Sequence, residues 1–198
     1  GIAPQGIIAN VIASFQAMIG LMGFSFITGL LYGRFSKPKA AVKFSKNIIV
    51  RDFKESRALM FRLMNSRKSV MIEPSVTVTL AVSEFEEETK SYKRNFYQLA
   101  LEREKIMYLP TIWTLVHELD DKSPLTKYSN EELKELDAEL YILMQYHDEA
   151  FSQKLFKIYS YKFDKLKTDV QFETSSSFDE EGYTLLDHDK LDQFNTMD

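Results

Sequence analysis

The sequence has no cysteine and is poor in several other residues that often carry chemistry. Its 198 residues include three histidines, one tryptophan, five prolines and seven glycines. Without cysteine, neither a disulfide framework nor a thiolate metal site can form. The motifs GxxxxGK[ST], HExxH and GxSxG are also missing. The usual sequence evidence for an enzyme is therefore lacking, and the absence of cysteine fits a reducing compartment.

Charge is missing from the first 33 residues. All 25 basic and 29 acidic residues follow Gly33, so the formal net charge of −4 describes neither part of the chain. Residues 34–198 are long enough for one domain with a real hydrophobic core. The two parts therefore call for separate interpretation.

The charge-free stretch predicts a transmembrane helix. Residues 7–33 contain only five polar side chains: Asn10, Ser14, Gln16, Ser25 and Thr28. As a helix they would reach about 40 Å, more than the ~30 Å hydrocarbon core of a bilayer. A signal peptide would begin with basic residues and have a shorter apolar core. A buried helix of this length would be unusual in so small a domain.

Basic residues follow the helix directly. Five of them occur with no acidic residue between: Arg34, Lys37, Lys39, Lys43 and Lys46. By the positive-inside rule, such a flank places residues 38–198 in the cytoplasm. Because the sequence begins with Gly, we expect it to be a fragment of a longer protein.

Glycines and an aromatic stripe mark the interior of the helix. Glycine occurs at four positions: Gly20, Gly23, Gly29 and Gly33. Each costs about 1 kcal/mol relative to alanine in a helix interior, and in membranes such residues allow either close helix packing or a bend. Phe24, Thr28 and Tyr32 are four residues apart and share a face. This face either contacts lipid or lines an aqueous path in an oligomer.

After Pro38 the pattern changes to short β-rich runs separated by turn and charge clusters. This spacing predicts a β-sandwich. In residues 72–80 the even-numbered positions are apolar and the odd-numbered ones polar, so Ile72 should face the core and Glu73 the solvent. Pro74 places this section near a strand end or on a sheet edge.

Three further segments have local patterns. Residues 84–94 predict a charged, solvated hairpin turn. Ser129 with Glu132 three residues later predicts a short capped helix. The segment 173–198 has eight acidic residues against one lysine, which argues against nucleic acid as a partner, and it contains an expected last strand in residues 183–194.

His117 stands beside the carboxylates of Glu118, Asp120 and Asp121, a combination that can bind a metal ion. Metal ligands normally come as converging sets, and no second histidine lies at a suitable spacing. We therefore predict no metal site.

Six segments resemble a known family. In chain order they are YGRFSKPKA, FSKN, LMFRLMNSRKS, IEPSVTVTL, WTLVHELDDKSPL and HDEAFSQ. Together with the glycine-bearing apolar helix, they resemble the inward-rectifier potassium channels, most closely the prokaryotic branch. The resemblance covers essentially the whole chain.

The resemblance implies part of a tetrameric ion channel. In that family each subunit has an outer helix, a pore helix with a selectivity filter, an inner helix and a cytoplasmic immunoglobulin-like β-sandwich. By the resemblance, residues 1–37 are the post-filter segment and inner pore helix, and residues 38–198 the immunoglobulin-like β-sandwich, of a homotetramer in the cell (inner) membrane. K+ would be the permeant ion, with no cofactor. A TVGYG-type filter is not among these residues.

Position by position, the resemblance assigns a gate within the helix. Gly20 and Gly29 match the family's hinge positions, and Tyr32 matches the bulky residue at the helix-bundle crossing. Phe24 and Thr28 would line the pore. Because Phe24 replaces the acidic residue of strong rectifiers, we expect only weak block by Mg2+ or polyamines.

The resemblance also assigns residues to a cytoplasmic pore. Glu73 matches an acidic lining residue, although the alternation alone is also explained by a merely solvated carboxylate. Gln145 stands at a second, usually acidic, lining position. His147 lies in the segment that resembles the loop at the top of this pore, and is a candidate pH-sensitive group.

Basic residues near the membrane are the third set. Five match family positions close to anionic lipid headgroups: Arg34, Lys37, Lys39, Arg67 and Lys68. Each adds about 1 kcal/mol of attraction to an anionic surface. The sign of the lipid effect stays open, and orienting the helix is an alternative role for this basic flank.

Two other functions compete with a channel subunit. One is a single-pass, membrane-anchored β-sandwich that acts as a binding or scaffold module. The other, a membrane-tethered enzyme, has no catalytic constellation to support it. Our expectation also places the chain in the broad group of voltage-gated channels.

Overall fold

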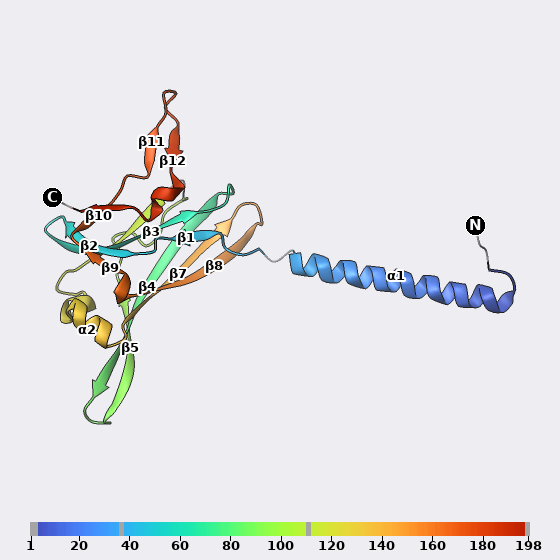
Figure 1. The fold of residues 1–198 in the computed structure, drawn as a ribbon, viewed down its shortest axis with the longest axis horizontal. Coiled ribbons are helices and arrows are strands. Elements are labelled where there is room, and N and C mark those ends of the chain that lie inside the picture. Colours follow the sequence, from blue (N-terminus) through green and yellow to red (C-terminus); the bar gives the residue numbers. More distant parts are fainter. Residues whose placement is uncertain (1–3, 36–37, 110–111, 197–198) are drawn as a thin grey trace. The chain divides into compact units, whose positions relative to one another are not determined.

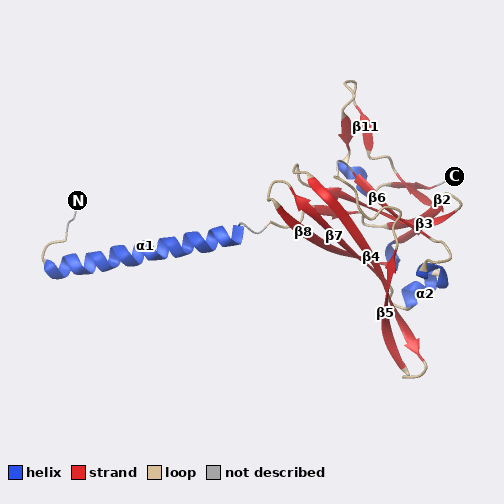
Figure 2. Cartoon of the chain, turned by 180° about the vertical axis from the view of Figure 1, so that it is seen from behind, coloured by secondary structure: helices blue, strands red, loops and turns tan. Residues whose placement is uncertain are grey.

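The computed structural model describes residues 4–35, 38–109 and 112–196. The chain divides into two compact units, Gly1–Lys39 and Ala40–Asp198. The first holds one long helix, α1, and the second is built mainly from β-strands (Figure 1; seen from behind in Figure 2).

Helix α1 (Ile7–Phe35) runs unbroken for 29 residues, and none of them is buried within the chain. It alone among the described helices has the length and hydropathy to cross a membrane. A helix that is apolar all round suits a lipid environment. Its hydroxyls are satisfied inside the helix, since Thr28 donates to the carbonyl of Phe24 and Ser14 to that of Asn10, both at 2.8 Å.

The first sheet of the β domain is centred on its longest strand. Its strands are β1 (Val42–Phe44), β2 (Ile48–Phe53), β3 (Ser56–Asn65), β6 (Ile112–Glu118) and β9 (Leu166–Thr168). One edge of β3 pairs with β6, and its other edge pairs with β2 and then β1. β9 lies parallel to β2, while the other pairs are antiparallel.

The second sheet is fully antiparallel, in the order β5-β4-β7-β8. Its strands are β4 (Met71–Glu86), β5 (Ser91–Leu99), β7 (Glu139–Asp148) and β8 (Gln153–Lys162). Two small ribbons follow: β10 (Val170–Phe172) with β13 (Phe194–Thr196), and β11 (Ser176–Phe178) with β12 (Thr184–Leu186). Helix α2 (Asn130–Glu135) and three 3-10 turns, at Pro124–Lys127, Phe163–Lys165 and His188–Leu191, complete the described elements.

The inner faces of the two sheets fill one hydrophobic core. Alternate residues of β3 and β4 meet there: Leu59, Phe61 and Leu63 from one sheet, and Val76, Val78 and Leu80 from the other. Burial of each such side chain contributes about 1.5–3 kcal/mol. The predicted fold class, an apolar helix followed by a β-sandwich, is confirmed.

A second, smaller apolar cluster lies on the outer face of the first sheet. It joins Ile49 of β2, Ala58 and Met60 of β3, and Val170 and Phe172 of β10. Partly buried apolar side chains of β6 and β13 pack against it. The first sheet is therefore buried on part of both faces.

The expected alternation in residues 72–80 breaks at Glu73. The β4–β7 register shifts between Ile72 and Ser75, and Glu73 has a left-handed backbone with φ of 48°. A β-bulge adds one residue and so reverses the faces on one side of it. The prediction that Ile72 faces the core is therefore wrong: its side chain is exposed, while Pro74 is buried.

The predicted hairpin and capped helix are confirmed. β4 and β5 pair out to the turn at 87–90. Ser129 and Glu132 form both hydrogen bonds of a capping box at the start of α2. The segment 183–194 is not one strand, because it contains β12, a 3-10 turn and the first residue of β13.

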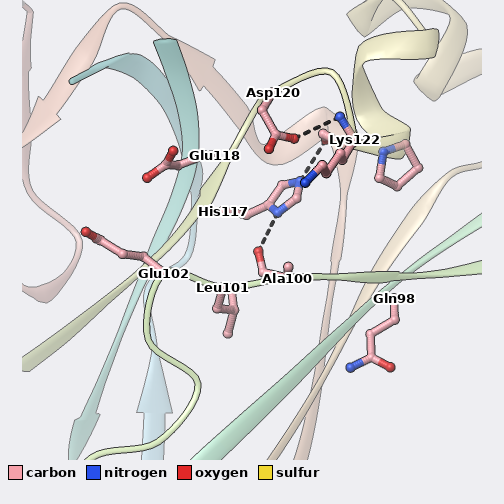
Figure 3. A pocket seen from close by; sticks show the side chains of 10 residues that line it. Gln98, Ala100, Leu101, Glu102, His117, Glu118, Asp120 and Lys122 are labelled. Atoms are coloured by element: carbon pink, nitrogen blue, oxygen red, sulfur yellow. Dashed lines mark hydrogen bonds between the residues drawn. The ribbon is translucent and has the colours of Figure 1, made fainter. Parts of the chain in front are cut away.

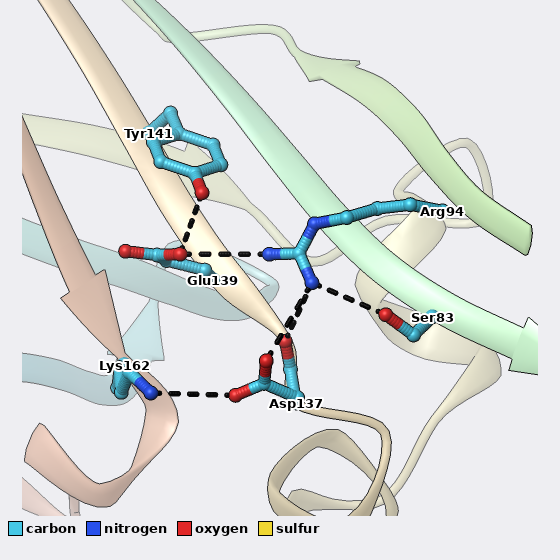
Figure 4. Close-up of polar contacts among 6 residues, drawn as sticks. All are labelled: Ser83, Arg94, Asp137, Glu139, Tyr141 and Lys162. Atoms are coloured by element: carbon cyan, nitrogen blue, oxygen red, sulfur yellow. Dashed lines mark hydrogen bonds and ion pairs between the residues drawn. The ribbon is translucent and has the colours of Figure 1, made fainter.

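An ion-pair network fixes the end of α2 to the second sheet (Figure 4). Asp137, with φ of 45°, closes the helix in a left-handed conformation. Its carboxylate lies 3.7 Å from Arg94 of β5 and 3.4 Å from Lys162 of β8. Glu139 of β7 pairs with the same arginine at 3.5 Å and accepts a hydrogen bond from Tyr141 at 2.6 Å. The network joins α2 to three strands.

Replacement of Tyr161 by phenylalanine should lower the free energy of unfolding by about 1–3 kcal/mol. The buried Tyr161 hydroxyl donates to the Ser45 carbonyl oxygen at 2.6 Å, and Ser45 is itself fully buried. Tyr161→Phe would leave that carbonyl without its partner. The matched control is Tyr159→Phe, because Tyr159 makes no side-chain hydrogen bond to a described residue. Urea unfolding of the full chain in detergent measures both, and equal losses would contradict this account.

Candidate functional site

Three residues expected to line a cytoplasmic pore lie together at one end of the second sheet. In the β4–β7 ladder Ile72 pairs with His147 and Ser75 with Gln145, and Glu73 lies in the bulge between these pairs. The neighbours of Gln145 and His147 along β7 point into the core, so these two side chains face outward. The structure thus gathers Glu73, Gln145 and His147 on one outer face.

Glu73 has a basic partner that sequence reasoning missed. The Nζ of Lys105 lies 3.0 Å from its carboxylate, with both side chains more than half exposed. An exposed pair of this kind stabilises the fold by only about 0–1 kcal/mol, but it offsets the negative charge. Lys105 belongs to the loop between β5 and β6, which bridges to β4 at Ser75. No spacing in the sequence indicates this contact.

Beside these residues, part of the outer face is apolar. Leu143 pairs with Ile158, and Gln145 with Phe156, across β7 and β8. Ile158 is 70% exposed and Phe156 57% exposed within the single chain. Contiguous exposed apolar surface of this kind marks interaction sites. The polar end formed by Glu73, Gln145 and His147 continues directly into it.

Arg67 and Lys68 lie in the turn between β3 and β4. The Arg67 guanidinium lies 5.2 Å from the centre of the Phe151 ring, and its backbone N–H donates to Asn65 Oδ1 at 2.9 Å. Among the described residues, no carboxylate is within ion-pair distance of either base. The turn therefore presents two uncompensated positive charges.

The remaining predicted residues belong to the unit of α1. Arg34 is in the last turn of the helix and Lys39 is exposed, whereas Lys37 is outside the described residues. Tyr32 and Phe24 are 76% and 70% exposed. Apart from the adjacent backbone of α1 itself, a methyl group added at Gly20 or Gly29 would meet no atom within 4 Å in the single chain.

His117 is engaged in structural hydrogen bonds (Figure 3). Its Nδ1 donates to the Ala100 carbonyl at 2.7 Å, so its unprotonated Nε2 accepts from the Ser123 hydroxyl at 2.8 Å. Burial lowers the pKa of the imidazole, against a smaller opposing effect of the Ala100 carbonyl. Since both ring nitrogens are occupied, His117 holds the turn at Ser123. In the described part of the chain no three metal-ligating side chains converge.

The buried His117 should make stability fall on mild acidification. Because its pKa is below the ordinary value of 6.5 in the folded state, the unfolded chain binds the proton first as pH falls below about 6.5. Stability is then lost, by at most about 1.4 kcal/mol per pH unit. Urea unfolding of the full chain between pH 7.5 and 5 measures this slope.

The variant His117→Gln should flatten that slope, and the exposed His147→Gln should leave it unchanged. Four carboxyl groups whose pKa values are lowered by hydrogen bonds, those of Glu84, Glu86, Glu132 and Glu139, lose their contributions below about pH 4.5, outside this range. An identical slope in wild type and His117→Gln would show that another group is responsible.

Comparisons with known proteins match the β domain and most of the chain. Residues 42–198 match the family model described as the inward rectifier potassium channel C-terminal domain. The inward rectifier potassium channel Kirbac3.1 of Paramagnetospirillum magnetotacticum is 32% identical over 163 residues, which cover 82% of this chain and 55% of that protein. The G protein-activated inward rectifier potassium channel 4 of Mus musculus is 26% identical over 148 residues, which cover 72% of this chain and 35% of that protein. The chain thus spans about half and a third of these relatives' lengths.

A solved structure of the sporulation control protein Spo0M from Bacillus subtilis also overlaps in part. It is 8% identical, with a TM-score of 0.31, over 61% of this chain and 48% of that one. This likeness is too low to support an argument.

Proposed function

Because the chain belongs to the inward rectifier potassium channel family, we propose that it is part of a subunit that conducts K+ across the membrane. In this proposal, four identical subunits surround one path, and the outer face of the second sheet turns toward it. The gathering of Glu73, Gln145 and His147 on that face, from two strands, is the observation that supports the proposal most directly.

Family membership settles several coarser predictions. The family consists of ion channels, which supports the predictions of a non-enzyme, of K+ as the ion and of no cofactor. The broad grouping with voltage-gated channels is not supported. The matching family model and relatives are described as inward rectifiers and not as voltage-gated channels.

The charges named at the cytoplasmic end of the proposed path nearly cancel. Four carboxylates from Glu73 around an axis would concentrate cations by focusing the electric field. In each subunit Lys105 offsets this charge at 3.0 Å, and neutral Gln145 adds none. The proposal therefore predicts little enrichment of K+ at this end.

Rubidium flux into liposomes that contain the full-length protein tests the proposal. K+ and Rb+ should enter and Na+ should not. Lys105→Gln exposes the Glu73 carboxylate, so it should raise flux by about two- to tenfold at low salt, and Glu73→Gln should lower it by a similar factor. Lys134→Gln, which removes an exposed charge on α2, is the control. Electrostatic steering predicts that these differences shrink at high salt.

Two negative results have different meanings. Absence of any K+-selective flux would contradict the channel proposal and favour the single-pass scaffold. If the wild-type protein conducts K+ and the flux of Lys105→Gln and Glu73→Gln equals that of wild type, only the placement of this face on the path is contradicted.

We also propose that α1 carries the gate, with Tyr32 closing the path and Gly20 and Gly29 allowing the helix to bend. The Thr28 hydroxyl is bound to the Phe24 carbonyl, so the stripe presents mainly rings and a methyl group. Four such stripes facing one another would favour closure by steric occlusion and dewetting.

Tyr32→Ala should therefore raise flux under conditions that close the channel. The control is Tyr92→Ala, which removes a similarly exposed tyrosine from the β4–β5 hairpin. A closed-state leak that stays at the wild-type level in Tyr32→Ala would contradict the gate.

Lipids and polyvalent cations complete the proposal. Arg34, Lys37, Lys39, Arg67 and Lys68 would bind anionic headgroups; Arg67 and Lys68 support this because no described carboxylate pairs with them. With apolar Phe24 in place of an acidic ring, Mg2+ and polyamines would block only weakly. The helix would lie in the cell (inner) membrane, with residues 38–198 in the cytoplasm.

A further inference from the structure

Two arginines line one pocket on the outer face of the first sheet, a feature that the channel function does not use. Arg51 of β2 and Arg62 of β3 both line a cavity of about 260 Å³. Both side chains are half-buried. Among the described residues, no carboxylate is within ion-pair distance of either guanidinium. Such a pair of unneutralised charges is unusual, because burial of a charge without a partner is costly.

The guanidinium of Arg62 is held in place from three sides. Its Nε donates to Thr114 Oγ1 of β6 at 3.2 Å, and its Nη1 donates to the carbonyl oxygen of Glu173 at 2.6 Å. Its plane lies 4.6 Å from the centre of the Phe172 ring. These contacts use two of five N–H groups, and the other three have no partner among the described residues. The group is thus positioned with donors to spare.

Arg51 adds a second cation whose position is fixed by the strand register. Residues 49, 51 and 53 of β2 point to the outer face, on which Ile49 lies opposite Met60 and Arg51 opposite Ala58. Burial, and then the charge of Arg51, lower the pKa of Arg62 to about 10. The two like charges therefore repel each other across the pocket, and a bound anion would relieve this repulsion.

Apart from Thr114 and Gln171, the other residues that line the pocket are apolar. Ile49, Phe53, Met60, Val116 and Phe172 line it, and most of them belong to the small cluster beneath β10. Inorganic phosphate would leave these walls in contact with water, whereas a ligand with an apolar part would cover them. The volume is close to the lower limit of about 300 Å³ for small-molecule sites.

We propose that this pocket binds a small organic anion: a phosphate or carboxylate that carries a short apolar or aromatic group. The two guanidiniums would bind the anionic group, for which planar arginine is well suited. The apolar walls would contact the remainder of the ligand. Free organic phosphates and phospholipid headgroups share this chemistry.

Isothermal titration calorimetry of the full chain in neutral detergent tests the proposal with hexyl phosphate, inorganic phosphate and hexanol. Hexyl phosphate should bind at least about tenfold more tightly than either of the others, because only it uses both the arginines and the apolar walls. Equal affinity for hexyl phosphate and inorganic phosphate, or no binding of hexyl phosphate, would overturn the proposal.

Two variants and one control locate the binding site. Arg51→Gln should weaken hexyl phosphate binding by about tenfold or more with an unchanged unfolding midpoint, because Arg51 has no described partner to lose. Arg62→Lys keeps the charge but loses the planar fork, and should also weaken binding. Arg103→Gln makes the same change as Arg51→Gln at an exposed position in the β5–β6 loop, and should bind like wild type. Equal binding by Arg51→Gln and Arg103→Gln would overturn the proposal.

Competition with lipid distinguishes the two sources of the anion. Phosphatidic acid added to the detergent micelles displaces hexyl phosphate if the pocket takes a lipid headgroup. Hexyl phosphate that stays bound identifies a soluble organic phosphate. Both results retain the site at Arg51 and Arg62.

Discussion

The burial of one face of each sheet against the other is the constraint on which the rest of the domain depends. Side chains along a strand alternate between the two faces of the sheet. Once alternate residues fill the shared core, the residues between them must therefore face outward. Leu59 and Phe61 inside, for example, require Met60 and Arg62 outside. The two outer faces then differ in what covers them. The first is partly covered by β10 and β13, while the second is open to solvent in the single chain.

Among the described strand pairs, the register shifts at the bulge around Glu73, which lies at the proposed site. A left-handed backbone at a residue other than glycine costs about 1–2 kcal/mol, and such outliers often occur at functional sites. Glycine would remove the strain but also the carboxylate that meets Lys105.

The sequence predicted features that depend on local patterns, and failed where distant contacts decide. The uncharged helix, the sandwich, the hairpin and the Ser129 capping box follow from periodicity and short-range spacing. The outward turn of Ile72 and the pairing of Glu73 with Lys105 depend on a bulge that no residue type marks. The pocket of Arg51 and Arg62 could not be predicted from the sequence, because β10, which supplies one of its walls, lies over a hundred positions later in the chain.

Spin-label distance measurement on the full-length protein in liposomes tests most directly whether four copies of the Glu73 face surround one axis. This chain has no cysteine, so His147→Cys places one label in it once any cysteine outside these residues is replaced. A ring of four predicts two distances, the longer about 1.4 times the shorter, as for the diagonal and side of a square. Both distances should be shorter than the two corresponding distances measured with the label at Lys167→Cys on the first sheet. A single distance, or distances at His147 longer than those at Lys167, would contradict the account.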